Sequence, residues 1–186
     1  MVQAFGGPGG GGQIRGIGTQ SFTRSAEGAV GIVVDGVPQG NVNTNNIFDT
    51  ERVEVLRGPQ GTLFGLTASA GVINMVTVAP DTSRMTVKGQ LDLSHDGSAG
   101  SKFGQQAVRA VLNLPLSGNS ALRISANGDR LDGVQFNALS GEKNVSKDFG
   151  IRARYLWKGV DNLQVNLIAD YDKRTQNYAD PQFTYV

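Results

Sequence analysis

The sequence predicts a mainly β fold in two parts, and three observations lead to this prediction. Glycine makes up 26 of 186 residues, about twice the usual ~7%, and helix-rich domains avoid it. Five segments of the second half alternate apolar and polar residues, which is the period of a β-strand. No stretch approaches the ~20 apolar residues of a membrane helix, whereas a membrane β-strand needs only ~9–11 residues with alternate ones apolar.

Composition and isolated residues argue against several classes of function. Lys and Arg number 17 against 16 Asp and Glu, so a net charge of +1 gives no reason to expect nucleic acid as a partner. Cysteine is absent, and His95 is the sole histidine, which makes a poor metal site without clustered ligands. Ser69 lacks the Gly-x-Ser-x-Gly elbow, and Asp49 and Glu51 form no convincing catalytic pair. We therefore expect no metal, no cofactor and no enzymatic activity.

The first part contains short strand candidates separated by turn residues. The β-rich runs are Gly28–Asp35, Arg52–Arg57 and Gly71–Thr77. A turn is expected at Asp35–Gly36, and Gly58–Pro59 breaks the chain after the second run. Gly61–Gly71 is expected to form a turn with a short helix. Pro80 ends the third run, so we divide the chain into domains of residues 1–80 and 81–186.

The second part contains the five alternating segments, each about as long as a membrane strand. Their apolar positions run through Met85–Leu93, Val108–Leu116, Leu122–Gly128, Phe149–Trp157 and Leu163–Tyr171. The connections alternate in length: longer at His95–Phe103 and Leu131–Lys147, tight at Ser117–Ser120 and Gly159–Asn162. Outer-membrane barrels alternate turns and loops in this way, but a soluble barrel or sandwich has the same strand pattern. Five strands are too few to close a membrane barrel of about eight or more, which indicates a fragment.

Four sequence blocks of the first part resemble a known domain. They are Ile14–Thr19, Val33–Val37, Phe48–Gly65 and Ala70–Thr77, and in this order and spacing they resemble the plug domain of TonB-dependent outer-membrane receptors. The run Glu-Val-Leu-Arg-Gly-Pro-Gln-Gly that starts at Glu54 is the most specific of these signals. Two departures are Leu66-Thr67, where many relatives have Arg-Asn, and Val78-Ala79, where many have a basic pair before Pro.

The resemblance implies a fold and a set of partners. Residues 1–80 would hold the C-terminal part of a mixed α+β plug, and residues 81–186 the first antiparallel strands of a transmembrane barrel of about 22 strands. Such receptors lie in the bacterial cell outer membrane and import a scarce ligand, such as a ferric siderophore, cobalamin or another nutrient. The implied partners are the TonB complex, an extracellular small-molecule ligand and outer-membrane lipid. We expect the signal peptide and the TonB-contacting segment to be absent from this chain.

The resemblance also assigns roles to individual residues. Charged plug residues of the family pair with the polar inner wall of the barrel, because a buried unpaired charge is expensive. The matching residues here are Glu51, Arg52, Glu54 and Arg57. These pairs would act either as a latch that loosens when TonB pulls or as ordinary docking ion pairs. A sharp turn would follow at Gly58, Pro59 and Gly61.

Ligand contacts in the family come from plug loop tips and from the barrel wall. The regions of Arg15, Gln39 and Phe48 resemble these tips, and the planar guanidinium of Arg15 suits an anionic ligand. Arg15 could equally pair with the barrel wall, and Gln39 and Phe48 could be plain turn residues. Two further interpretations of the whole chain stay open: a soluble β-rich binding or enzyme domain, and a short plug-like binding or regulatory module without transport activity.

Overall fold

The computed structural model describes most of the chain, and within the described residues the secondary structure consists of strands and turns. The described residues are 2–4, 12–15, 17–18, 28–39, 47–60, 65, 68–94, 104–136, 143–159 and 163–177. The chain divides into two compact units, an N-terminal unit of Met1–Val78 and a C-terminal unit of Ala79–Val186. No described helix is long and apolar enough to cross a membrane.

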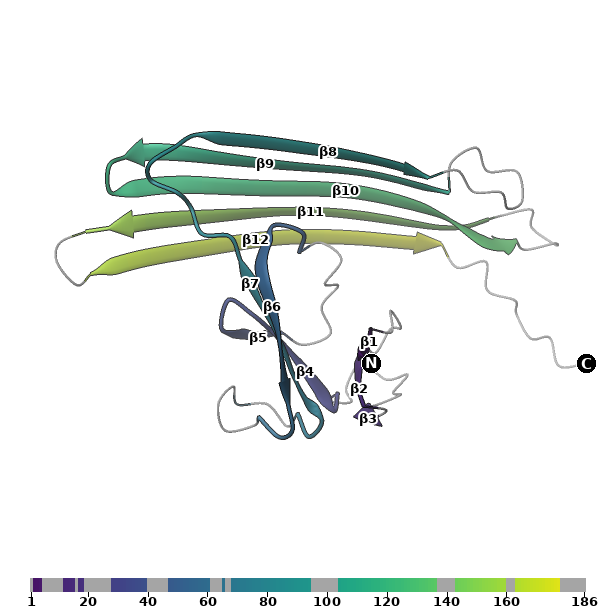
Figure 1. The fold of residues 1–186 in the computed structure, drawn as a ribbon. Helices are drawn as coiled ribbons and strands as arrows, with labels where there is room; N and C mark the ends of the chain where they lie inside the picture. The colour runs from purple at the N-terminus through teal and green to yellow at the C-terminus, as the bar shows by residue number, and fades with distance from the viewer. Residues whose placement is uncertain are drawn as a thin grey trace, which may run out of the picture. The chain divides into compact units, whose positions relative to one another are not determined.

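The N-terminal unit contains two small sheets (Figure 1). The first is antiparallel, in the order β1 (Val2–Ala4), β2 (Gly12–Ile14) and β3 (Ile17–Gly18). The second has the order β5-β4-β7-β6, and its strands are β4 (Val30–Val34), β5 (Val37–Gln39), β6 (Thr50–Arg57) and β7 (Gly71–Thr77). β4 runs parallel to β7, and the other pairs are antiparallel.

The core of this unit lies on both faces of strands β4 and β7. Val72 and Ile73 are successive residues of β7 and therefore point to opposite faces, yet both are buried. Each belongs to a different apolar cluster: Ile73 packs with Ile14, Val30 and Ala70, and Val72 packs with Val33 and Ala68. A central strand covered on both faces needs a near-continuous apolar run, which is why the sequence of β7 shows no clean alternation.

The predicted mixed α+β character of the first part is wrong for the described residues, which are all β. Part of the segment expected to carry a helix, residues 61–64 and 66–67, lies outside the described residues. Within the remainder, Gly65 has φ +65° and Gly71 has φ +145°, and neither value belongs to a right-handed helix. Glycine and serine favour turns over helix, so the composition of this segment opposes the helix that we expected.

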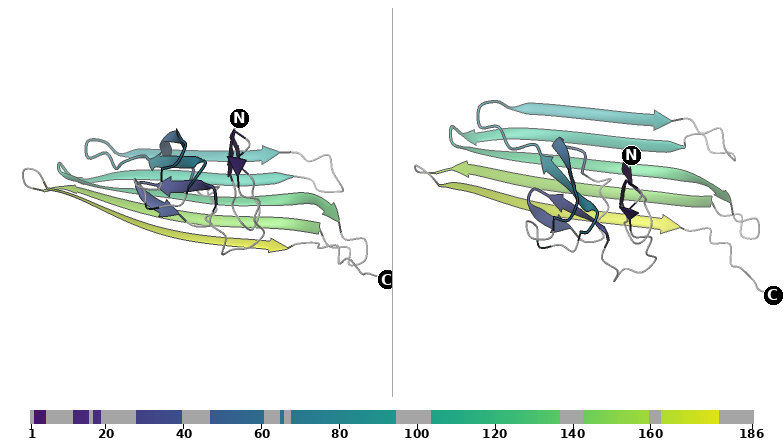
Figure 2. Two further views of the ribbon diagram at one scale, coloured as in Figure 1. Left: turned by 90° about the horizontal axis from the view of Figure 1, so that it is seen from below. Right: turned by 60° about the horizontal axis from the view of Figure 1, so that its bottom comes forward.

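The C-terminal unit is a five-stranded antiparallel meander in the order β8-β9-β10-β11-β12 (Figures 1 and 2). Its strands are β8 (Thr86–Ser94), β9 (Gln105–Ser117), β10 (Ser120–Phe136), β11 (Lys143–Lys158) and β12 (Gln164–Asn177). The sheet is open, with β8 and β12 at its edges.

The register of this sheet confirms the predicted alternation. Val87 pairs with Leu112, Leu114 with Leu122, and Tyr155 with both Leu122 and Leu167, so apolar positions of all five strands share one face. A slip of one residue would move these side chains to the other face, which is why the alternation specifies the register.

Two strands are longer than predicted. β10 continues to Phe136 and β11 begins at Lys143, so much of the expected loop Leu131–Lys147 is paired strand. Leu131 pairs with Ser146, for example. These extensions carry few apolar residues in alternation, so the sequence carries no strand signal there. They form strand because pairing with the neighbouring strand satisfies their backbone N–H and C=O groups. The tight turn at Gly118–Asn119 is confirmed, whereas the connection at His95–Phe103 lies outside the described residues.

Candidate functional site

A ladder of charges on β6 forms the best-defined polar cluster of the N-terminal unit. Arg52 and Glu54 are two residues apart and therefore share one face of the strand. Arg52 Nε donates to Glu54 Oε1 at 2.7 Å, and Arg52 Nη1 donates to Glu51 Oε1 at 3.4 Å. From the neighbouring strand β7, Asn74 Nδ2 donates to Glu54 Oε2 at 3.0 Å, because Glu54 and Asn74 are register partners.

These contacts favour the charged forms of both partners. Hydrogen bonds first from Arg52 and then from Asn74 lower the pKa of the Glu54 carboxyl below its ordinary value of 4.5. Conversely, the hydrogen bond to Glu54 raises the pKa of Arg52. All three members of the ladder are substantially exposed, and exposed ion pairs of this kind contribute little to stability. The main effect of these contacts is therefore to hold the charged side chains in position on β6, and their contribution to the stability of the fold is small.

Arg57 differs from the other predicted charged residues. It is exposed at the end of β6, and it makes no ion pair with any residue that the structure describes. The structure thus brings Glu51, Arg52 and Glu54 together and leaves Arg57 apart from them. The expected role of all four residues in bridges to a barrel wall stays a prediction.

Gly58 and Pro59, two of the residues assigned to the predicted turn, directly follow β6. Gly58 adopts φ +83°, a left-handed conformation that glycine accepts without strain, and its N–H donates to the carbonyl of Ala70 at 3.1 Å. Pro59 is exposed and has no N–H to satisfy. Gly61, the third residue assigned to this turn, lies outside the described residues.

The three residues predicted to face a ligand lie on separate elements. Arg15 follows β2 in a turn, is exposed, and has φ +56°. Gln39 ends β5 and donates from Nε2 to the carbonyl of Val37 at 3.2 Å. Phe48 is half-buried just before β6. No hydrogen bond or ion pair among the described residues connects the three, so a shared ligand site stays a prediction.

Sequence reasoning missed the role of Asp35, although it predicted the turn that contains it. Asp35 (φ +48°) and Gly36 (φ +81°) form the two-residue connection between β4 and β5 that we expected. The Asp35 carboxylate also accepts two hydrogen bonds from Thr77, at 2.9 Å from the backbone N–H and 2.7 Å from Oγ1. The only sequence signal was the Asp-Gly pair, which predicts the turn but not the distant partner.

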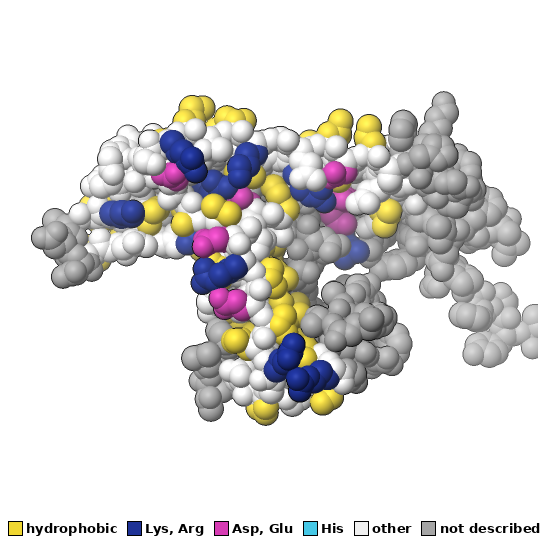
Figure 3. Space-filling view, viewed as in Figure 1, with side chains coloured by type: hydrophobic (Ala, Val, Ile, Leu, Met, Phe, Trp, Pro, Cys, Tyr) yellow, Lys and Arg dark blue, Asp and Glu magenta, His cyan; other side chains and the backbone are white. Residues whose placement is uncertain are grey.

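The two faces of the five-stranded sheet differ in polarity. On one face, large apolar side chains are exposed, including Val87 (69%), Leu91 (64%) and Leu167 (60%). On the other face, register partners form ion pairs, such as Arg152 with Asp170 at 2.7 Å. Figure 3 shows charged side chains of both signs beside one another over the sheet, with hydrophobic side chains protruding along its upper margin. The sheet thus has one apolar face and one polar face with cross-strand ion pairs.

The described residues offer no metal site. No group of three or more His, Cys, Asp or Glu side chains within the described ranges is placed to hold a metal ion. His95, which we judged a poor ligand, lies outside those ranges.

Comparison with known proteins links the N-terminal unit to one family. A family model for the TonB-dependent Receptor Plug Domain matches residues 1–72. The pesticin receptor of Yersinia pestis is 54% identical over 56 residues, which cover 30% of this chain and 8% of that protein. The catecholate siderophore receptor Fiu of Escherichia coli K12 is 27% identical over 122 residues, covering 66% of this chain and 15% of Fiu. The chain thus spans only a small share of the length of these relatives.

The fold is shared with solved receptors. The crystal structure of a mutant of the ferric enterobactin receptor PfeA from Pseudomonas aeruginosa matches with a TM-score of 0.68 and 18% identity, over 81% of this chain and 26% of that chain. At that identity the match shows the fold alone. The sequence blocks around β6 and β7 agree with the plug-domain match, and residues 1–72 belong to the family of TonB-dependent receptor plug domains.

Proposed function

We propose that this chain is part of a receptor in the bacterial outer membrane that imports a scarce extracellular ligand with energy delivered by the TonB complex. The main support is that a unit matched by the plug model is followed in the chain by a sheet whose apolar side chains are exposed. We infer that residues 1–80 are the C-terminal part of the plug and that residues 81–186 are the first barrel strands. Ligands of this class include ferric siderophores, cobalamin and other nutrients.

The polarity of the sheet supports the inferred contact with lipid. A soluble protein rarely exposes a whole apolar sheet face to water, because burying apolar surface stabilises a protein by about 25 cal/mol per Å². In lipid the same face is solvated, while the ion pairs of the opposite face would line a polar interior. Along the strands, outside the polar ends of β10 and β11, the two kinds of residue alternate, as membrane strands require.

Uptake measurements test the proposed function. We expect the open reading frame that contains this chain to restore uptake of one radiolabelled ligand in a bacterial strain lacking its own receptors, tested over a panel of ferric siderophores and cobalamin. Uptake should fall to background in an otherwise identical strain without TonB, because transport needs energy from the inner membrane.

Replacing Arg15, Gln39 and Phe48 together with alanine should weaken binding of that ligand to the receptor. The same exchange at exposed Val37 serves as the control.

Either of two results would contradict the proposed function. One is uptake that is equal with and without TonB. The other is a product that fractionates with soluble proteins and transports nothing, which would favour the short binding or regulatory module. Binding unchanged by the triple alanine variant would contradict only the ligand assignment of Arg15, Gln39 and Phe48.

We further infer that Arg57 is the charged residue of β6 that docks the plug in the receptor. Arg52 already has two partners on its own strand, whereas Arg57 has no ion pair among the described residues. We expect Arg57→Ala to increase the rate at which a protease cleaves the plug of the assembled receptor, by roughly the tenfold that corresponds to ~1.4 kcal/mol. Arg52→Ala is the matched control and should change the rate little. Equal effects of the two changes would rule out a special docking role for Arg57.

A further inference from the structure

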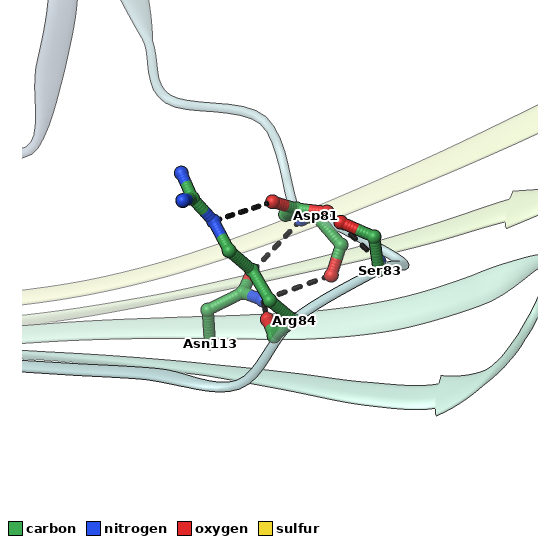
Figure 4. Close-up of polar contacts among 4 residues, drawn as sticks. All are labelled: Asp81, Ser83, Arg84 and Asn113. Atoms are coloured by element: carbon green, nitrogen blue, oxygen red, sulfur yellow. Dashed lines mark hydrogen bonds and ion pairs between the residues drawn. The ribbon is translucent and has the colours of Figure 1, made fainter.

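Asn113 is an uncharged polar residue of β9 that is completely buried, at 0% exposure. All the hydrogen-bonding capacity of its donor group is used on the segment that precedes β8 (Figure 4). Asn113 Nδ2 donates to the carbonyls of Asp81 at 2.9 Å and Arg84 at 2.8 Å. Asn113 Oδ1 accepts from the backbone N–H of Asp81 at 2.9 Å. One side chain thus holds three backbone groups of residues 81–84, and we call these contacts the Asn113 clamp.

The segment that the clamp holds is itself ordered by a second set of bonds. Asp81 Oδ1 accepts from Ser83 N at 2.8 Å and from Ser83 Oγ at 2.5 Å, and Asp81 Oδ2 accepts from Arg84 Nε at 3.1 Å. The bonds from Ser83, with help from Arg84, lower the pKa of the Asp81 carboxyl below its ordinary 3.8. The turn is therefore formed around an ionised carboxylate at neutral pH, and it presents two carbonyls and one N–H to Asn113.

The chemistry of the clamp requires an amide. Asparagine provides two N–H donors and an acceptor on one short uncharged side chain. Aspartate at this position would offer no donor and would face two carbonyl oxygens with a negative charge. Leucine would fill a similar volume without bonding any of the three backbone groups. Because unpaired buried polar groups are costly, either change favours release of residues 81–84 into water.

The clamp also determines how much chain is free between the two units. In the N-terminal unit, Thr77 is bonded to Asp35, and Val78 N donates to the carbonyl of Asp49 at 3.0 Å. In the C-terminal unit, the bonds of the clamp begin at Asp81. The chain between these held points is Ala79 and Pro80, and an extended residue spans at most about 3.6 Å. The connection cannot lengthen appreciably unless one of the held points opens.

We propose that Asn113 anchors the connection between the two units to the five-stranded sheet, so that motion of the connecting chain stops at Asp81. The anchor itself is a property of the C-terminal unit. Its significance under load rests on the proposed receptor function: a pull on the N-terminal unit would be resisted at the clamp before it reached the first residue of β8. Asn113 is therefore a positioning residue that acts through the backbone of residues 81–84.

Trypsin cleavage after Arg84 tests the anchor. The Arg84 side chain is exposed, but its carbonyl is held by Asn113, so the bond to Met85 should resist trypsin in the folded 186-residue chain in detergent micelles. We expect Asn113→Asp and Asn113→Leu each to accelerate this cleavage about tenfold or more, because aspartate loses the two donated hydrogen bonds and leucine loses all three. Cleavage after Arg109, Arg123 and Arg152, within the strands, should stay slow. Peptide masses identify each site.

Asn119→Asp provides the matched control, because exposed Asn119 accepts a hydrogen bond from Ser117 Oγ at 2.6 Å that a carboxylate also accepts. It should leave cleavage after Arg84 unchanged. The proposal is overturned if Arg84 is cleaved equally fast in all variants. It is also overturned if cleavage at every strand site rises with it, since Asn113 would then merely stabilise the sheet. The assay uses no ligand and no TonB, so its failure would leave the proposed function standing, and absent uptake would leave the anchor standing.

Discussion

Replacing Gly71 with alanine is expected to destabilise the N-terminal unit by about 3 kcal/mol or more, the range of backbone strain combined with overpacking. Gly71 has φ +145°, a conformation that residues with a Cβ rarely adopt. A Cβ there would lie 2.3 Å from the carbonyl oxygen of Leu56 and 2.9 Å from Cδ1 of Ile14. The first atom belongs to the backbone of β6, so the clash cannot be relieved without separating β6 from β7.

Gly58→Ala separates the two causes of this effect. Gly58 also has positive φ, at +83°, but a Cβ there would have no atom within 4 Å, so it should cost only about 1–2 kcal/mol. Hydrogen exchange of the backbone amides of β4 and β7 reports the local free energy of opening in each variant. Equal losses of protection in the two variants would show that close packing at Gly71 is unimportant.

Asp35→Ala is expected to lower the local free energy of opening of the N-terminal unit by about 2–4 kcal/mol, measured by hydrogen exchange of the β4 and β7 amides. The change removes two hydrogen bonds from Thr77 to the Asp35 side chain, leaves the N–H of buried Thr77 without that acceptor, and places alanine at φ +48°. Because Thr77 ends β7, its release would also free the chain that leads to the C-terminal unit.

Asp35→Gly is the control that removes the carboxylate without the backbone strain, since glycine accepts positive φ. Asp35→Gly should therefore be less destabilising than Asp35→Ala, by about 1 kcal/mol. Thr77→Ser, which keeps the hydroxyl and the N–H, should cost least of the three. If the β7 amides are protected from exchange equally well in Asp35→Ala and in the unchanged protein, the hydrogen bonds to Thr77 do not stabilise the N-terminal unit.

The predictable elements are those whose signal is local in the sequence. Alternation from Phe149 to Trp157 is enough to choose the apolar face of β11, because side chains of a strand alternate strictly. The Asp35–Gly36 turn follows from residues that tolerate positive φ. Where the sequence was misread, at the polar ends of β10 and β11, the local signal was weak and pairing with neighbouring strands decided the structure.

By itself, the sequence determined the resemblance of the first part to a plug domain and the division of each strand of the five-stranded sheet into an apolar and a polar face, since both are read from the order of residues along the chain. Tertiary structure alone decided which polar residues matter. Asp35 meets Thr77 and Asn113 meets Asp81 across long separations, and nothing in the surrounding residues distinguishes them from other polar positions. Hydrogen bonds between distant segments have no period, so only the folded backbone shows which donor meets which acceptor.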